Sequence, residues 1–274
     1  MNEKVINNYS KIKPTFFIVP ILFLIIIFIN LYVKDSLSIG KYVENQKEHF
    51  YMLNSLLSQF PYIDNFNELG DALIFSSLIS MFIIYAPKIW ESLFSAFIIS
   101  FLASVLLKKM FAIPRPAAAL EHDSFVIIGR ALFGNNSMPS GHAITVFTVL
   151  TIIFFAFTPQ RSNYRIIWSL LTIVVGAIIG FARVGVGAHY PLDVVIGGIL
   201  GYLIGLCGIY ISQKTKIWLW INYRKNYPIF ILIFFLCCIL VIRKILEESL
   251  IIFYIALICL LFSLYKITSL YAKK

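Results

Sequence analysis

The sequence predicts an all-α protein, a polytopic bundle of transmembrane helices. Hydrophobic residues make up 60% of its 274 residues and charged residues only 13%, whereas roughly a quarter of a soluble domain is charged. Hydropathy also resolves into eight apolar stretches, each close to the ~20 residues that a bilayer core requires. Runs such as Ile18–Ile29 are almost continuously apolar, while the strands of a membrane barrel alternate apolar and polar residues. Since only helices and closed barrels satisfy every backbone group in lipid, helices are expected.

The expected spans, in chain order, are 16–33, 71–86, 89–107, 142–157, 166–182, 191–212, 227–242 and 250–265. The first one resembles a secretory signal because lysines precede it. Its apolar core is longer than that of a signal, however, and the exit Asn30–Lys34 lacks the small residues at which signals are cleaved. We therefore expect an uncleaved anchor.

The spans divide the chain into four parts: 1–33 with a cytoplasmic N-terminal segment and the first helix, 34–70 as an outer connection, 71–212 with the remaining core helices, and 213–274 with a basic loop and two additional C-terminal helices. In the connection 34–70, Phe50, Leu53, Leu57 and Phe60 recur at helical spacing. This pattern fits an amphipathic helix in the headgroup layer and equally a helix packed on the bundle.

Lys and Arg gather in alternate short loops, on the side of the membrane that holds both chain ends. By the positive-inside rule, both ends are expected in the cytoplasm. This topology accounts for the net charge of +10, so no nucleic-acid partner is needed. The same topology places three polar strings together on the outer, periplasmic face.

Those strings carry three cations, two histidines and a carboxylate. The first holds Lys108 and Arg115, the second is Ser140-Gly141-His142, and the third holds Arg183, His189 and Asp193. Charged side chains in or beside a membrane are costly and indicate a functional site. Residues 108–141 are too polar to span, and prolines on both sides of Arg115 forbid a regular helix there. We expect this segment to form a folded cap over the site.

The residue types suit phosphoryl transfer, in which catalysis is mostly positioning and stabilisation of negative charge. Lys108, Arg115 and Arg183 supply cations, and an arginine fork can hold two phosphate oxygens. Ser140 and Gly141 would offer backbone N–H groups at the start of a helix.

The two histidines and the aspartate supply the remaining chemistry. Asp193 lies four residues after His189, so its carboxylate could orient one ring nitrogen and leave the other free to attack phosphorus. His142 would protonate the leaving oxygen and then activate water.

In their order and spacing the three strings resemble the phosphatidic acid phosphatase type 2 superfamily, and the similarity extends over roughly residues 70–212. The resemblance implies a six-helix core with an extracytoplasmic site. Lys108, Arg115, Ser140, Gly141 and Arg183 would bind phosphate. His189 would form a phosphohistidine, His142 would be the general acid, and Asp193 would orient His189. The chain departs from the family by Ala182, where serine is frequent, and by the two helices beyond the core.

These patterns predict an enzyme of the bacterial inner membrane that removes phosphate from a lipid phosphate or diphosphate without metal or other cofactor. Candidate substrates are phosphatidic acid, phosphatidylglycerol phosphate, undecaprenyl diphosphate and a lipid A phosphate. A phosphotransferase would use the same residues, and a lipid-phosphate binding or transport protein would need only the cations. A haloperoxidase fits less well because that branch of the family is soluble. The bilayer and the lipid substrate are the expected partners, and no obligate protein partner is inferred.

Several other features are expected to be structural. Glu121, His122 and Asp123 are weak evidence for a metal site, and Arg130 and Asn135-Asn136 are expected in a solvated turn. Glycines at 176 and 180 and at 197, 201 and 205 have the spacing of tight helix packing. We expect them to join the fifth and sixth spans.

Overall fold

The computed structural model describes residues 1–273, and that part of the chain contains helices and no strand. The all-α prediction is confirmed. The helices are α1 (Asn2–Tyr9), α2 (Ile18–Val33), α3 (Ile39–Leu57), α4 (Ile63–Leu69), α5 (Ala72–Leu78), α6 (Phe82–Tyr85), α7 (Pro87–Phe111), α8 (Pro116–Ala119), α9 (Gly141–Phe157), α10 (Ser162–Gly185), α11 (Pro191–Lys214), α12 (Tyr227–Glu247) and α13 (Ile251–Ala272). Short 3-10 helices lie at Pro14–Phe17, His122–Ser124, Leu219–Asn222 and Arg224–Asn226.

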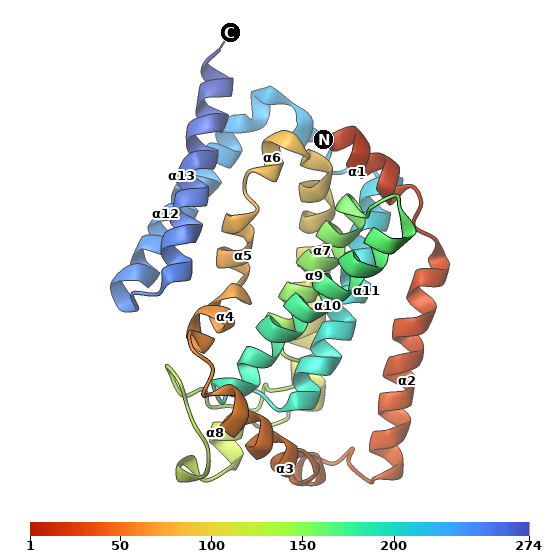
Figure 1. Ribbon diagram of the computed structural model, residues 1–274, viewed down its shortest axis with the longest axis vertical. Coiled ribbons are helices and arrows are strands. Elements are labelled where there is room, and N and C mark those ends of the chain that lie inside the picture. The colour runs from red at the N-terminus through yellow and green to blue at the C-terminus, as the bar shows by residue number, and fades with distance from the viewer. Residues whose placement is uncertain (274) are drawn as a thin grey trace.

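The helices form a bundle in which α9 lies among α7, α10 and α11 (Figure 1). Helix α2 flanks the bundle on one side, and the α12–α13 hairpin lies on the other side beyond α5. The helix α3 and the segment around α8 close one end, while both chain ends lie at the opposite end. The segment 108–141, which we expected to form a cap, thus lies at the opposite end of the bundle from the two termini.

The protein is a multi-pass membrane protein, since six helices within residues 1–273 are long and apolar enough to cross a bilayer. They cover Pro14–Val33, Pro87–Ala119, Ser162–Gly185, Pro191–Lys214, Arg224–Glu247 and Ile251–Ala272. Helix α9 is apolar but has only 17 residues. The expected continuous span 71–86 is wrong: it is divided into α5 and α6 by a turn at residues 79–81. In that turn the Ser80 hydroxyl lies 2.7 Å from the Ser263 hydroxyl of α13, a polar contact that ties the break to the hairpin.

The glycines of α11 allow its backbone to lie directly against that of α9. A Cβ atom at Gly197 would lie 2.7 Å from the carbonyl oxygen of Ser140, and one at Gly201 would lie 2.5 Å from that of Ile144. The expected pairing of the α11 glycines with the fifth span, α10, is therefore wrong. Of the two α10 glycines, Gly180 does face α11, since its Cβ atom would lie 3.2 Å from Val194, whereas Gly176 faces α9. Small residues predict that a close contact exists, but they do not say with which helix.

The connection 34–70 packs on the bundle instead of lying free in the headgroup layer. Tyr42 and Phe50 of α3 are fully buried. The side chain of Asn54 is also buried, and it donates to the carbonyl oxygens of Val184 (3.0 Å) and Val126 (2.9 Å) and accepts from the Val126 N–H (2.8 Å). Helix α3 is therefore attached both to the end of α10 and to the cap.

Candidate active site

The three polar strings converge at the capped end of the bundle. Lys108 lies in the last turn of α7, and Ser140 is the N-cap of α9. Arg183 lies in the last turn of α10, and Asp193 lies in the first turn of α11. His189 lies in the short connection between α10 and α11. Because these helices run antiparallel, the end of one and the start of the next bring the residues of all three strings to the same end of the bundle.

Asp193 is fully buried and anchors His189. Its Oδ2 atom lies 3.4 Å from Nδ1 of His189. The same oxygen accepts from the Ser137 hydroxyl (2.6 Å) and from the Tyr190 N–H (2.9 Å), while Oδ1 accepts from the Tyr42 hydroxyl (2.7 Å). Helix α11 begins with Pro191, as predicted, which sets Asp193 in its first turn facing back to the histidine. An ionised Asp193 would hold the proton of His189 on Nδ1 and leave Nε2 as the free base.

Tyr42 connects α3 with this carboxylate, and burial together with the Asp193 charge holds the pKa of Tyr42 well above 10.0. Its hydroxyl therefore remains a hydrogen-bond donor at physiological pH.

We expect Tyr42→Phe to lower kcat roughly ten- to hundredfold, because a hydrogen bond to a charged group is worth about 1.5–3 kcal/mol. Phosphate release under saturating substrate measures this. Tyr51→Phe on the same helix is the matched control, and an equal loss in both variants would contradict the role given to Tyr42.

His189 lies among the three cations of the site. Nη1 of Arg115 lies 3.4 Å from Nε2 of His189 and donates to the Ala188 carbonyl at 3.2 Å. Burial lowers the pKa of His189 well below 6.5, and the charges of Arg115, Arg183 and Lys108 lower it further. The imidazole is therefore neutral at physiological pH, which is the form that can attack phosphorus.

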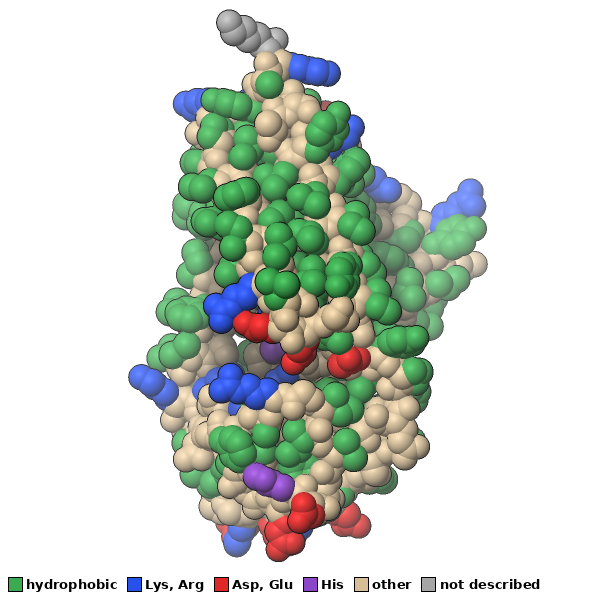
Figure 2. All heavy atoms as spheres, turned by 90° about the vertical axis from the view of Figure 1, so that its left-hand side faces the viewer, with side chains coloured by type: hydrophobic (Ala, Val, Ile, Leu, Met, Phe, Trp, Pro, Cys, Tyr) green, Lys and Arg blue, Asp and Glu red, His purple; other side chains and the backbone are tan. Residues whose placement is uncertain are grey.

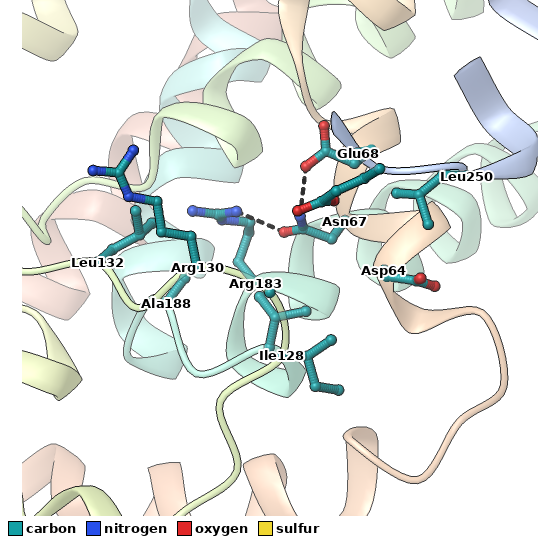
Figure 3. A pocket seen from close by; sticks show the side chains of 12 residues that line it. Asp64, Asn67, Glu68, Ile128, Arg130, Leu132, Arg183, Ala188 and Leu250 are labelled. Carbon is teal, nitrogen blue, oxygen red and sulfur yellow. Dashed lines mark hydrogen bonds between the residues drawn. The ribbon is translucent and has the colours of Figure 1, made fainter. Parts of the chain in front are cut away.

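Arg183 points into a pocket of about 160 Å³ beside the site (Figure 3). Its Nη1 donates to the Asn67 side-chain oxygen of α4 at 2.6 Å. Within residues 1–273 its Nε is buried without a hydrogen-bond partner. A buried guanidinium with unused donors is suited to an anion.

Lys108 lies over the start of α9. A Cβ atom at Gly141 would lie 3.6 Å from Nζ of Lys108, an ordinary contact distance, so the ammonium lies close to the start of the helix. The Ser140 N–H donates to the carbonyl oxygen of Asp193 at 3.0 Å, and the Ser140 hydroxyl caps the Ala143 N–H at 3.4 Å. The Ser140 N–H is therefore already occupied, contrary to expectation. In the described part of the chain, the N–H groups of Gly141 and His142 have no protein acceptor.

His142 lies against Gly70, at the junction of α4 and α5. A Cβ atom at Gly70 would lie 2.9 Å from both Cβ and Cδ2 of His142, and the Cβ atom of a helical residue cannot move away without the backbone. We expect Gly70→Ala to displace the imidazole and lower kcat roughly tenfold or more, because catalytic groups tolerate little misplacement. Phosphate-release kinetics measure this. Gly40→Ala is the control, since a Cβ atom at Gly40 meets nothing within 4 Å. Full activity in Gly70→Ala would show that the contact between Gly70 and His142 does not position the imidazole.

Residues 88–217 match the model of the PAP2 superfamily. This segment belongs to the PAP2 superfamily. It contains all eight residues that the sequence singled out, and it excludes α12 and α13.

The chain is 35% identical over 81 residues to an undecaprenyl-diphosphatase of Sulfolobus acidocaldarius, a match that covers 30% of this chain and 36% of the relative. It is 34% identical over 117 residues to a lipid A 1-phosphatase of Rhizobium etli, covering 42% of this chain and 46% of the relative.

The matched stretches thus span less than half of either relative. Among solved structures, Aquifex aeolicus LpxE is 25% identical with a TM-score of 0.48, and the match covers 60% of this chain and 93% of that one.

The PAP2 strings account for only part of the site. Ser137, three residues before the second string, is buried beside Asp193, and no sequence pattern marked it. No sequence pattern gave a role to Tyr42, Gly70 or Asn67, all of which lie outside the matched segment. Asn136 is not merely part of a solvated turn, because its side-chain oxygen accepts from Nε of Arg115 at 2.7 Å.

Two further polar residues of the cap, Arg130 and His122, lie outside the three strings. Arg130 lies in the pocket with Arg183 (Figure 3). His122 begins a short 3-10 helix of the cap, and its Nε2 lies 2.8 Å from the Ala117 carbonyl oxygen.

Proposed function

We propose that the protein is an integral-membrane phosphatase that hydrolyses a phosphomonoester or diphosphate of a lipid through a phosphohistidine at His189. The observation that carries the proposal is the orientation of His189, with Nδ1 against the buried Asp193 and Nε2 facing Arg115. A histidine that served only structure would have no need of a ring nitrogen that faces a cluster of cations. The names of the two relatives support lipid phosphates as the substrate class.

The proposed reaction has two steps. In the first, Nε2 of His189 attacks phosphorus, the bond to the lipid oxygen breaks, and His142 gives that oxygen a proton. Lys108, Arg115 and Arg183, with the N–H groups at the start of α9, stabilise the charge on the phosphoryl oxygens. In the second, His142 takes a proton from water, which attacks phosphorus and breaks the P–N bond. Inorganic phosphate leaves and His189 is restored.

We place the protein in the bacterial inner membrane with this site on the periplasmic face. The support is the distribution of Lys and Arg, which is densest in the loops at the end of the bundle opposite the site. No step of the proposed reaction requires a metal ion.

The test uses the full-length protein in detergent with phosphatidic acid, phosphatidylglycerol phosphate, undecaprenyl diphosphate and a lipid A phosphate, each assayed for inorganic phosphate with and without chelator. Release from at least one lipid, unchanged by chelator, supports the proposal. A failure with all four would overturn the phosphatase, and loss with chelator would overturn the metal-free mechanism. Phosphate that appears on an added acceptor lipid instead of in solution would indicate the phosphotransferase.

The pH profile follows from the lowered pKa of His189. Attack requires the neutral ring, so on the acidic side the rate falls as pH drops through the pKa of His189 in the free enzyme. Because burial and the neighbouring cations lower that pKa below 6.5, we expect the acidic limb of kcat/KM to lie below pH 6.5. Initial rates with a phosphomonoester and with a diphosphate measure it, since a limb set by the enzyme stays in place between them. A limb above pH 6.5 with both would contradict a neutral nucleophile.

A further inference from the structure

A cavity of about 600 Å³ begins at the proposed site and extends between α5, α7 and the α12–α13 hairpin. His142, Gly141 and Ser104 line its end at the site. Its walls are largely apolar: Phe94 and Phe97 come from α7, and Phe234 and Leu260 come from the hairpin. The volume falls within the roughly 300–1,000 Å³ of small-molecule sites. A space-filling view of this side shows a hollow with a histidine side chain inside it, below the apolar surface of the hairpin (Figure 2).

Polar contacts hold the hairpin at a fixed distance from α5 and thereby keep the cavity open. At the end of α12, Nζ of Lys244 forms ion pairs with Glu68 (2.7 Å) and Asp71 (3.3 Å). At the start of α13, the N–H of Ile252 donates to the side-chain oxygen of Asn65 at 3.1 Å. Farther along, the contact between Ser80 and Ser263 joins the break after α5 to α13.

Apolar walls of this extent favour an apolar occupant over water. Since the space continues from the groups that would bind phosphate, the hydrocarbon chain attached to that phosphate is the occupant with matching chemistry at both ends. One wall of the enclosure comes from α12 and α13, which lie outside the segment that matches the family model.

We propose that the α12–α13 hairpin is a specificity element: it forms the outer wall of a site for the hydrocarbon chain of the substrate and so selects lipids by that chain. The inference rests on the proposed function for its substrate class, but it concerns binding and is testable without turnover. Ile233, Phe234 and Cys237 of α12 and Leu260 of α13 form this wall. Lys244 positions the wall through Glu68 and Asp71.

The first experiment measures occupancy in the unaltered protein. Cys237 lines the cavity and Cys259 does not, so alkylation of Cys237 relative to Cys259 by N-ethylmaleimide, quantified by mass spectrometry, reports on the site. The probes are long-chain phosphatidic acid, its short-chain homologue, undecaprenyl diphosphate, farnesyl diphosphate and long-chain diacylglycerol. We expect at least one long-chain phosphate to slow Cys237 alkylation several-fold, with little effect of the short-chain homologue or diacylglycerol. Equal protection by diacylglycerol, or none by any probe, would overturn the inference.

The second experiment fills the cavity. Cys237→Trp places a large side chain in it, whereas Leu236→Trp on the same helix adds the same group at a position that is 50% exposed on the outer surface. We expect Cys237→Trp to lower the ratio of kcat/KM for long-chain over short-chain substrate roughly tenfold or more, within the range for contacts in apolar pockets, through a higher KM. The Leu236→Trp ratio should be unchanged. An unchanged ratio in Cys237→Trp would overturn the inference, and should that variant not fold, the alkylation result decides.

The two proposals fail in different ways. Protection of Cys237 without any phosphate release would contradict the proposed phosphatase and support the hydrocarbon site. Phosphate release without protection would support the phosphatase and contradict the hydrocarbon site.

Discussion

Replacement of His189 by glutamine is expected to abolish phosphate release while the protein remains folded. Glutamine retains a polar group of similar reach, but its amide nitrogen cannot attack phosphorus. Loss of a nucleophile costs roughly 10⁴-fold or more in kcat, because the steps that depend on it fail together. Binding of lipid phosphate should persist, since Lys108, Arg115 and Arg183 are unchanged. Phosphate release and protection of Cys237 from alkylation measure the two properties separately.

The same prediction has a chemical signature. Rapid denaturation of the enzyme during turnover of a ³²P-labelled substrate should leave acid-labile label on the wild-type protein and none on His189→Gln. His122→Gln, which changes an exposed histidine of the cap, is the control for a general effect of removing an imidazole. Retention of more than a trace of activity in His189→Gln would exclude the phosphohistidine mechanism.

The second large effect is expected for Asp193→Asn, at roughly 10³–10⁴-fold in kcat, the size seen when the carboxylate that fixes a catalytic imidazole becomes an amide. Three donors point at this carboxylate, from Tyr42, Ser137 and the Tyr190 N–H. An asparagine has only one oxygen to accept from them, and its NH₂ group would face another donor. It also ceases to hold the proton on Nδ1 of His189.

Phosphate-release kinetics, together with the melting temperature in detergent, separate this effect from loss of structure. Asp123→Asn in the exposed cap serves as the matched control. A variant with wild-type kcat would show that His189 needs no orienting carboxylate. A variant with a much lower melting temperature and proportionally reduced activity would assign Asp193 to stability alone.

Sequence reasoning predicted the helical class because apolar runs near 20 residues leave few alternatives in lipid. It also predicted which end of the bundle gathers the polar strings, since each string lies at a helix end and helix parity fixes the side. The start of α11 at Pro191 and the start of a helix at Ser140-Gly141 were likewise predicted from the local sequence. These predictions depend on short stretches of the chain, which is why they succeeded.

The remaining features depend on contacts between distant segments. Tyr42 reaches Asp193 across 151 positions, and Asn67 reaches Arg183 across 116. No local pattern distinguishes that tyrosine from its aromatic neighbours. The division of 71–86 into α5 and α6 was likewise hidden, because its serines are compatible with a continuous helix and the contact with α13 is far away in sequence.

The close packing of α11 on α9 restricts how the protein can change shape. Gly197 and Gly201 leave no room for even a methyl group between the two backbones, and the Ser140 N–H is bonded to Asp193 across the same seam. Backbones packed this closely resist sliding, so we expect α9 and α11 to move as one rigid unit. Efforts to alter the lipid range of this protein should therefore leave that seam untouched and redesign the opposite side of the cavity, where α5 and the hairpin face each other.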